Sequence, residues 1–126
     1  MQEFEKWIKK AEGDLYNVQL LLKDDNCQPD ICCFHCQQAA EKYLKPFFVS
    51  RQLDFPKTHD LELLIKLIVN QKPVFIQILP AALAITNYGL TPRYPDDTHE
   101  PTIGDAQQAY QNALIIKEFV LKNFFD

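Results

Sequence analysis

The sequence has only three glycines in 126 residues, and it contains no glycine-rich loop of the kind that cradles phosphate groups. It also lacks the serine-centred elbow of hydrolases and the paired histidines of metalloproteases. No apolar run approaches the roughly 20 residues needed to span a bilayer. Residues 1–12 are charged and amphipathic, unlike a secretory signal peptide. We therefore expect a soluble, cytoplasmic protein with no membrane partner.

The chain has no surplus of basic residues, because its formal net charge is −4. A large non-specific footprint on nucleic acid is excluded by this charge, and nothing in the sequence signals DNA specifically. A local basic site remains compatible with it. The length predicts one domain over residues 1–126, and the 47% hydrophobic content is sufficient for a core without disulfides.

The four cysteines, Cys27, Cys32, Cys33 and Cys36, lie within ten positions of one another. Thiols stay reduced in the cytoplasm, so disulfides are not expected. The Cys33-x-x-Cys36 spacing beside His35 allows a zinc site, but a zinc site needs a second ligand pair, and none is in reach. Three of the cysteines fall on the apolar face of a predicted helix. We therefore favour buried thiols, with no metal and no cofactor.

Apolar residues recur at helical spacing along most of the chain, and no alternation typical of strands rises above this signal. Helices are expected over residues 3–23, 29–50, 59–68, 74–88 and 102–125, which predicts an all-α, up-and-down bundle of four to five helices. The core candidates of four of these helices are Phe4, Trp7, Ile8, Ala11, Leu15, Val18 and Leu22; Leu61, Leu64, Ile65 and Ile68; Ile76, Leu79, Leu83, Ile85 and Tyr88; and Ile103, Ala106, Tyr110, Ala113, Leu114, Val120, Leu121 and Phe124.

Local signals predict where several helices begin and end. Pro46 should kink the second helix or end it early, and Pro80 should interrupt the fourth. Thr58 is expected to cap a third helix that begins with His59 and Asp60. Residues 102–105 read as a capping box that starts the last helix. Residues 89–101 are rich in proline and predict a long loop, a kind of segment that is often functional.

The stretch 32–48 divides into two faces when it is turned by about 100° per residue. One face is so broad and apolar that this helix should be central in the bundle. The other face permits two interpretations, a solvated surface or the lining of a groove, and periodicity alone favours the surface. This polar face consists of His35, Gln38, Glu41, Lys42 and Lys45.

Further polar clusters occur at residues 57–60, at residues 93–96 and at His99. Lysines offer point charges to a phosphate, whereas the Arg93 guanidinium offers a bidentate fork. Tyr94 or Tyr88 could stack a base, and the histidines could move protons near neutral pH. A structural alternative is also open, in which Arg93 pairs with Asp14 or Glu41 and holds the loop onto the bundle.

Four segments carry a family resemblance: A-x-x-D-L at residues 11–15, H-x-Q-Q-A-A-E-K-x-L-K at 35–45, P-K-T-H-D-L at 56–61 and R-Y-P-D at 93–96. In this order they resemble the HEPN family, the higher eukaryotes and prokaryotes nucleotide-binding domain. The chain is similar to a small stand-alone member of the R-Y-P-D type. The resemblance covers almost the whole chain.

The resemblance implies a helical bundle like the substrate-binding subunit of nucleotidyltransferases, and a homodimer. A dimer would also suit the aromatic residues Phe119, Phe124 and Phe125 near the C-terminus. Many members work beside a minimal nucleotidyltransferase as the toxin of a toxin–antitoxin pair. Members with an Arg-x4–6-His motif resemble metal-independent RNases, and Arg93-x5-His99 formally fits that spacing. Other members are thought to bind nucleotides without cleaving.

The leading hypothesis is therefore a binding module for a nucleotide or an RNA phosphate. The alternatives are a metal-independent RNase toxin, with Arg93 and His99 as catalytic residues, and a module for protein interaction only. The candidate nucleotide-binding residues are His35, Gln38, Glu41, Lys42, Lys45, Lys57, His59, Asp60, Arg93 and Tyr94.

Overall fold

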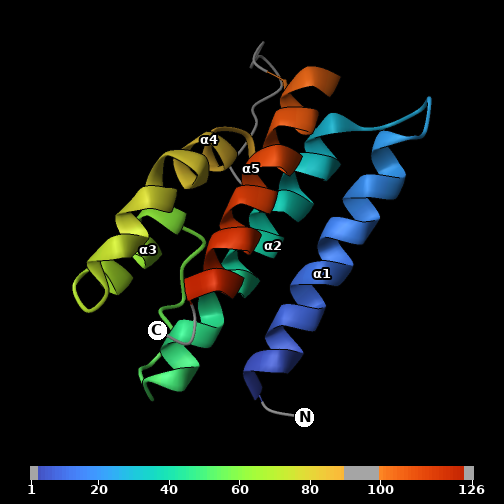
Figure 1. Ribbon diagram of the computed structural model, residues 1–126. Coiled ribbons are helices and arrows are strands. Elements are labelled where there is room, and N and C mark those ends of the chain that lie inside the picture. Colours follow the sequence, from blue (N-terminus) through green and yellow to red (C-terminus); the bar gives the residue numbers. More distant parts are fainter. Residues whose placement is uncertain (1–2, 90–99, 124–126) are drawn as a thin grey trace.

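The computed structural model describes residues 3–89 and 100–123, and all regular structure in these residues is helical (Figure 1). This confirms the all-α bundle. None of the helices in the described part is long and apolar enough to cross a membrane. The elements in chain order are α1 (Glu3–Leu22), α2 (Pro29–Ser50), α3 (Leu61–Val69), the 3-10 helix η1 (Pro73–Ile78), α4 (Leu79–Gly89) and α5 (Ile103–Asn123).

Helix α2 is the central element, as its wide apolar face predicts. It packs against α1, α3, α4 and α5, and Figure 1 shows it behind α5 with α1 on one side and α3 and α4 on the other. The chain runs along α1, turns back along α2, and finally descends along α5, so the main part is up-and-down. Tyr43 and Leu44 of α2 have no exposed surface. Burying side chains of this size contributes about 1.5–3 kcal/mol each.

An aromatic cluster closes the C-terminal end of α2. The Phe47 ring lies 5.9 Å from Phe75 of η1, which in turn lies 5.1 Å from Phe119 of α5. On the other side of α2, the Phe48 ring meets Phe55 edge to face at 5.2 Å. Phe119 is therefore partly buried by this cluster, while Phe124 and Phe125 lie outside the described residues.

The helix boundaries follow local capping chemistry, with two corrections. Pro46 does not end α2, which continues as a helix to Ser50. Thr58 does not cap α3: helix α3 begins at Leu61, and the side chain of Asp60 accepts a hydrogen bond from the backbone N–H of Leu63. A cap and its N3 partner lie three residues apart, which suits Asp60 but not Thr58.

The capping box of α5 is confirmed in both directions. The backbone N–H of Thr102 donates to the Asp105 carboxylate at 2.9 Å, and the N–H of Asp105 donates to the Thr102 hydroxyl at 3.1 Å. Two backbone donors that would otherwise lack a partner are thus satisfied. The local sequence alone was sufficient for this boundary.

Four of the expected core residues are exposed instead. Ile76 and Leu83 are 49% and 40% exposed, and Ile103 and Leu121 are 42% and 43% exposed. The error at Ile76 has a clear cause. Residues 73–78 form a 3-10 helix with three residues per turn, so the spacing of 3.6 residues used for an α-helix selects the wrong residues as buried. The side chain of Tyr88 and residue Phe124 lie outside the described part. The buried residues that the stripes missed are Phe75, Ile78, Ala81, Ala82, Ala109 and Ile116.

The cysteines are thiols, and three of them are buried on the apolar face of α2 as expected. Burial, together with a 3.4 Å contact between its sulfur and that of Cys27, raises the pKa of Cys32 to about 12. Burial also raises the pKa of Cys36. Because the thiolate is the reactive form, these two groups behave as small core side chains.

Candidate functional site

The main polar groove of the described residues lies between α2 and the segment 55–59, and α1 closes one side of it. Its volume is about 550 Å³. This is within the usual range of about 300–1,000 Å³ for sites that bind small molecules. The residues lining it are Trp7, Gln38, Glu41, Lys42, Lys45, Phe55, Pro56, Lys57, Thr58 and His59.

Helix α2 supplies the floor of the groove. Gln38, Glu41, Lys42 and Lys45 are spaced three, four and seven residues apart, which places them on one face of a helix. This face is not a solvated surface. Glu41 is only 9% exposed, and Lys42 and Lys45 are half-buried. The interpretation as a groove lining is therefore the right one.

Two buried side chains of α2 hold the segment 55–59 in place. The amide of Gln37, which has no exposed surface, donates a hydrogen bond of 2.6 Å to the backbone carbonyl of His59. The carboxylate of Glu41 lies 2.9 Å from Nδ1 of the His59 ring. A backbone contact and a side-chain contact thus meet at His59, and Asp60 then starts α3 immediately after it.

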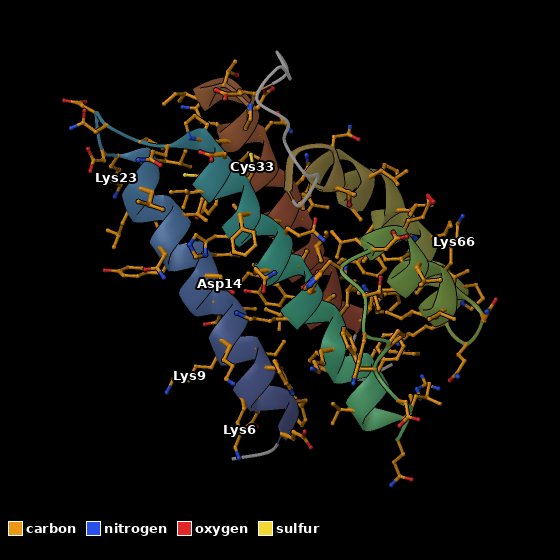
Figure 2. All side chains as sticks on the ribbon, turned by 180° about the vertical axis from the view of Figure 1, so that it is seen from behind. Lys6, Lys9, Asp14, Lys23, Cys33 and Lys66 are labelled. Atoms are coloured by element: carbon orange, nitrogen blue, oxygen red, sulfur yellow. The ribbon has the colours of Figure 1, made fainter. Side chains whose placement is uncertain are left out.

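A second ionic contact joins α1 to α2 beside the groove. The ammonium of Lys42 lies 2.6 Å from Asp14, and Nδ1 of His35 lies 3.4 Å from the same carboxylate. Figure 2 shows Asp14 in the middle of α1, on the side of the seam with α2. The Asp14 side chain is 12% exposed, so this pair is sheltered from solvent. The Asp14 carboxylate compensates the positive charge of Lys42.

The aromatic wall of the groove contains a lysine ammonium. Nζ of Lys45 lies 4.0 Å from the centroid of the Trp7 ring and 4.6 Å from that of Phe55. A second ammonium, that of Lys10, lies 4.9 Å from Trp7. Cations are attracted to the faces of aromatic rings, most strongly to tryptophan. The groove therefore combines two rings with a cation between them.

The charges of the groove leave a positive surplus. Lys42 is neutralised by Asp14, and Glu41 is hydrogen-bonded to the ring of His59. Across residues 3–89 and 100–123, no carboxylate forms an ion pair with Lys45 or Lys57. Two lysines are thus available to an anion in a recess that also offers hydrogen-bonding groups and aromatic faces.

Comparison with known proteins identifies the family of this chain. The profile of the HEPN domain family matches residues 4–123. The chain belongs to the HEPN domain family. Two solved structures share the fold of this HEPN chain, each with 26% sequence identity and with 97% of this chain and 98% of the other aligned. One is an archaeal HEPN homologue with a TM-score of 0.73, and the other is a protein from Thermus thermophilus with a TM-score of 0.80. None of the curated proteins compared with the chain matches it.

Most of the residues that the HEPN motifs contribute do converge. The groove brings together Gln38, Glu41, Lys42 and Lys45 of α2 with Lys57 and His59 from the following segment. Two other expected residues have different places. His35 lies outside the lining and contacts Asp14, and Asp60 caps α3. Arg93, Tyr94 and His99 lie outside the described residues, so their place in the site and the RNase alternative remain predictions.

Four residues of the groove lining are not among the site residues predicted from the sequence of this HEPN protein: Trp7, Phe55, Pro56 and Thr58. Trp7 fits the apolar stripe of α1 and was assigned to the core on that basis. Phe55 is a single aromatic residue in a polar loop, and nothing nearby in the sequence indicates its partner. The sequence gives Gln37 no predicted role beyond its place in the family motif. Its position beside the buried face of α2 was the feature that could have indicated a buried polar contact.

Replacing Asp14 by asparagine should reduce stability by about 1–3 kcal/mol, because the sheltered Lys42 ammonium would lose its charged partner. Urea denaturation of both proteins measures this difference. The matched control is Glu62→Gln, which removes an exposed ion pair of 3.5 Å with Lys66 on α3 and should change stability by no more than about 0.5 kcal/mol. Equal losses in the two variants would contradict the structural role assigned to Asp14.

Proposed function

We propose that this HEPN protein binds a nucleotide, or the phosphate of an RNA, in the groove between α2 and the segment 55–59. One observation carries the proposal: three separate parts of the chain bring two lysines and two aromatic rings to one recess of about 550 Å³, and neither lysine has a carboxylate partner among the described residues. The positive surplus favours an anion, and the rings favour a flat apolar group. A nucleotide has both.

Lys57 and Lys45 would bind the phosphate as point charges. Lys57 is exposed at the rim of the groove, and Lys45 can reach the same recess from the floor. His59 uses Nδ1 toward Glu41, which leaves Nε2 of its exposed ring for a ligand. Membership of the HEPN family, many of whose members act on nucleotides or RNA, supports the same ligand class.

Lys57→Ala should weaken binding about tenfold, because it removes one charge-assisted contact without disturbing any contact of the fold. Isothermal titration with AMP, ATP and a short single-stranded RNA measures the affinity. The matched control is Lys23→Ala. Lys23 is also exposed, and it lies at the end of α1 opposite to Lys6, the neighbour of Trp7 in the groove lining (Figure 2). Its replacement should leave the affinity unchanged. The proposal fails if none of the three ligands binds to the wild-type protein.

We further propose, on the family resemblance, that the protein forms a homodimer and works with a minimal nucleotidyltransferase in a toxin–antitoxin-type system. Exposed apolar side chains on α1 and α5 support a protein contact, since Tyr16, Leu20 and Ile115 are 60%, 48% and 49% exposed. Light scattering after gel filtration should give the mass of two chains, and a larger complex when a cognate nucleotidyltransferase is added. A single-chain mass under both conditions would contradict this proposal.

A further inference from the structure

Lys45 occupies a position between two aromatic rings that come from different parts of the chain. Its ammonium lies 4.0 Å from the Trp7 centroid and 4.6 Å from the Phe55 centroid, and all three side chains line the groove. The two centroids can be no farther apart than the sum of these distances. A flat ring in contact with two others needs a separation of about 7–8 Å, which is twice the carbon–carbon contact distance. The sum of the two ammonium distances exceeds this separation, so the two distances are compatible with a base in place of the ammonium.

One ring belongs to a helix, and the other, in the segment between α2 and α3, packs against a helix. Trp7 is carried by α1, and Phe55 packs edge to face on Phe48 of α2 with the ring planes at 84°. The backbone carbonyl of His59, four residues after Phe55, is bonded to Gln37. Both rings thus already line the groove, and Lys45 has the longest and most flexible side chain of the three.

We propose that Trp7 and Phe55 form a nucleobase subsite, and that the base takes the place of the Lys45 ammonium while Lys45 moves onto the phosphate of the same nucleotide. This inference rests on the proposed function and adds to it where the base lies and how Lys45 takes part in binding. Base stacking on an aromatic side chain tolerates every base. The subsite therefore selects nucleotides over other phosphates without reading their sequence.

The exchange predicts that base and phosphate assist each other. A phosphate without a base draws Lys45 away from the rings and leaves them uncovered. A base without a phosphate displaces the ammonium and gives it no new partner. Only a nucleotide replaces both contacts at once, since the rings gain a stacked base and the ammonium gains a charge-assisted bond.

Trp7 is the single tryptophan of the chain, so intrinsic fluorescence reports on this subsite alone. Titration with AMP, ribose 5-phosphate and adenosine should quench the emission with AMP. AMP should bind at least tenfold more tightly than ribose 5-phosphate, and ribose 5-phosphate should cause no stacking quench. Phe55→Leu keeps the fluorophore and should reduce the affinity for AMP to that for ribose 5-phosphate, as should Trp7→Leu when affinity is measured by calorimetry.

Two further variants sharpen the test. Lys45→Met keeps the length of the side chain but not its charge, and it should weaken AMP and ribose 5-phosphate while improving adenosine. Phe34→Leu replaces an exposed aromatic residue of α2 outside the groove and should change none of the three affinities. Equal binding of AMP and ribose 5-phosphate, without quenching, would overturn the base subsite and leave phosphate binding in place. Binding of neither would overturn the proposed function itself.

Discussion

The structure depends on polar side chains that lie on the most buried helix of the bundle. Helix α2 is surrounded by α1, α3, α4 and α5, yet it carries Gln37 and Glu41 where little water reaches them. A buried amide or carboxylate costs free energy unless it finds a partner. The amide of Gln37 is bonded to the backbone carbonyl of His59, and the carboxylate of Glu41 contacts the ring of His59. The requirement to satisfy these groups is what brings the segment 55–59 over the polar face of α2.

The same constraint separates structural charges from available ones. Asp14 pairs with Lys42, and the ring of His59 is hydrogen-bonded to Glu41. These contacts join α1 and the segment 55–59 to α2. Lys45 and Lys57 have no carboxylate partner among the described residues, and they face the recess that the other contacts create. The charges that stabilise the fold and the charges available to a ligand thus come from neighbouring but different residues. A variant in the first group should act mainly on folding, and one in the second mainly on the ligand.

The sequence was sufficient for features that arise from local chemistry. The five helices, the central position of α2 and the capping box at residues 102–105 follow from periodicity and from pairs of residues close together in the chain. One groove holds six residues of the family motifs, and their role in binding a nucleotide stays a prediction: Gln38, Glu41, Lys42, Lys45, Lys57 and His59.

The remaining features depend on contacts between distant segments, which periodicity does not register. Trp7 fits a core stripe and a groove wall equally well until the position of Phe55 is known. Ile76 fits a buried stripe only if its segment is an α-helix, and it is a 3-10 helix. Thr58 and Asp60 are both good caps, and the choice between them depends on where Gln37 holds the chain. The errors at Trp7 and Thr58 share one origin, the tertiary contacts of α2, whereas the error at Ile76 comes from the local 3-10 geometry.

The most direct test of the account is hydrogen exchange in a Gln37→Leu variant, which preserves bulk but removes the donor to the His59 carbonyl. The amides of residues 55–64 should exchange about tenfold faster than in the wild type, because losing the partner of a buried group costs about 1–3 kcal/mol and the cost should be confined to the segment it holds. Exchange in α1 and α5 should be unchanged. An unaltered rate in residues 55–64, or the same acceleration throughout all helices, would contradict the claim that buried polar groups of α2 position the groove.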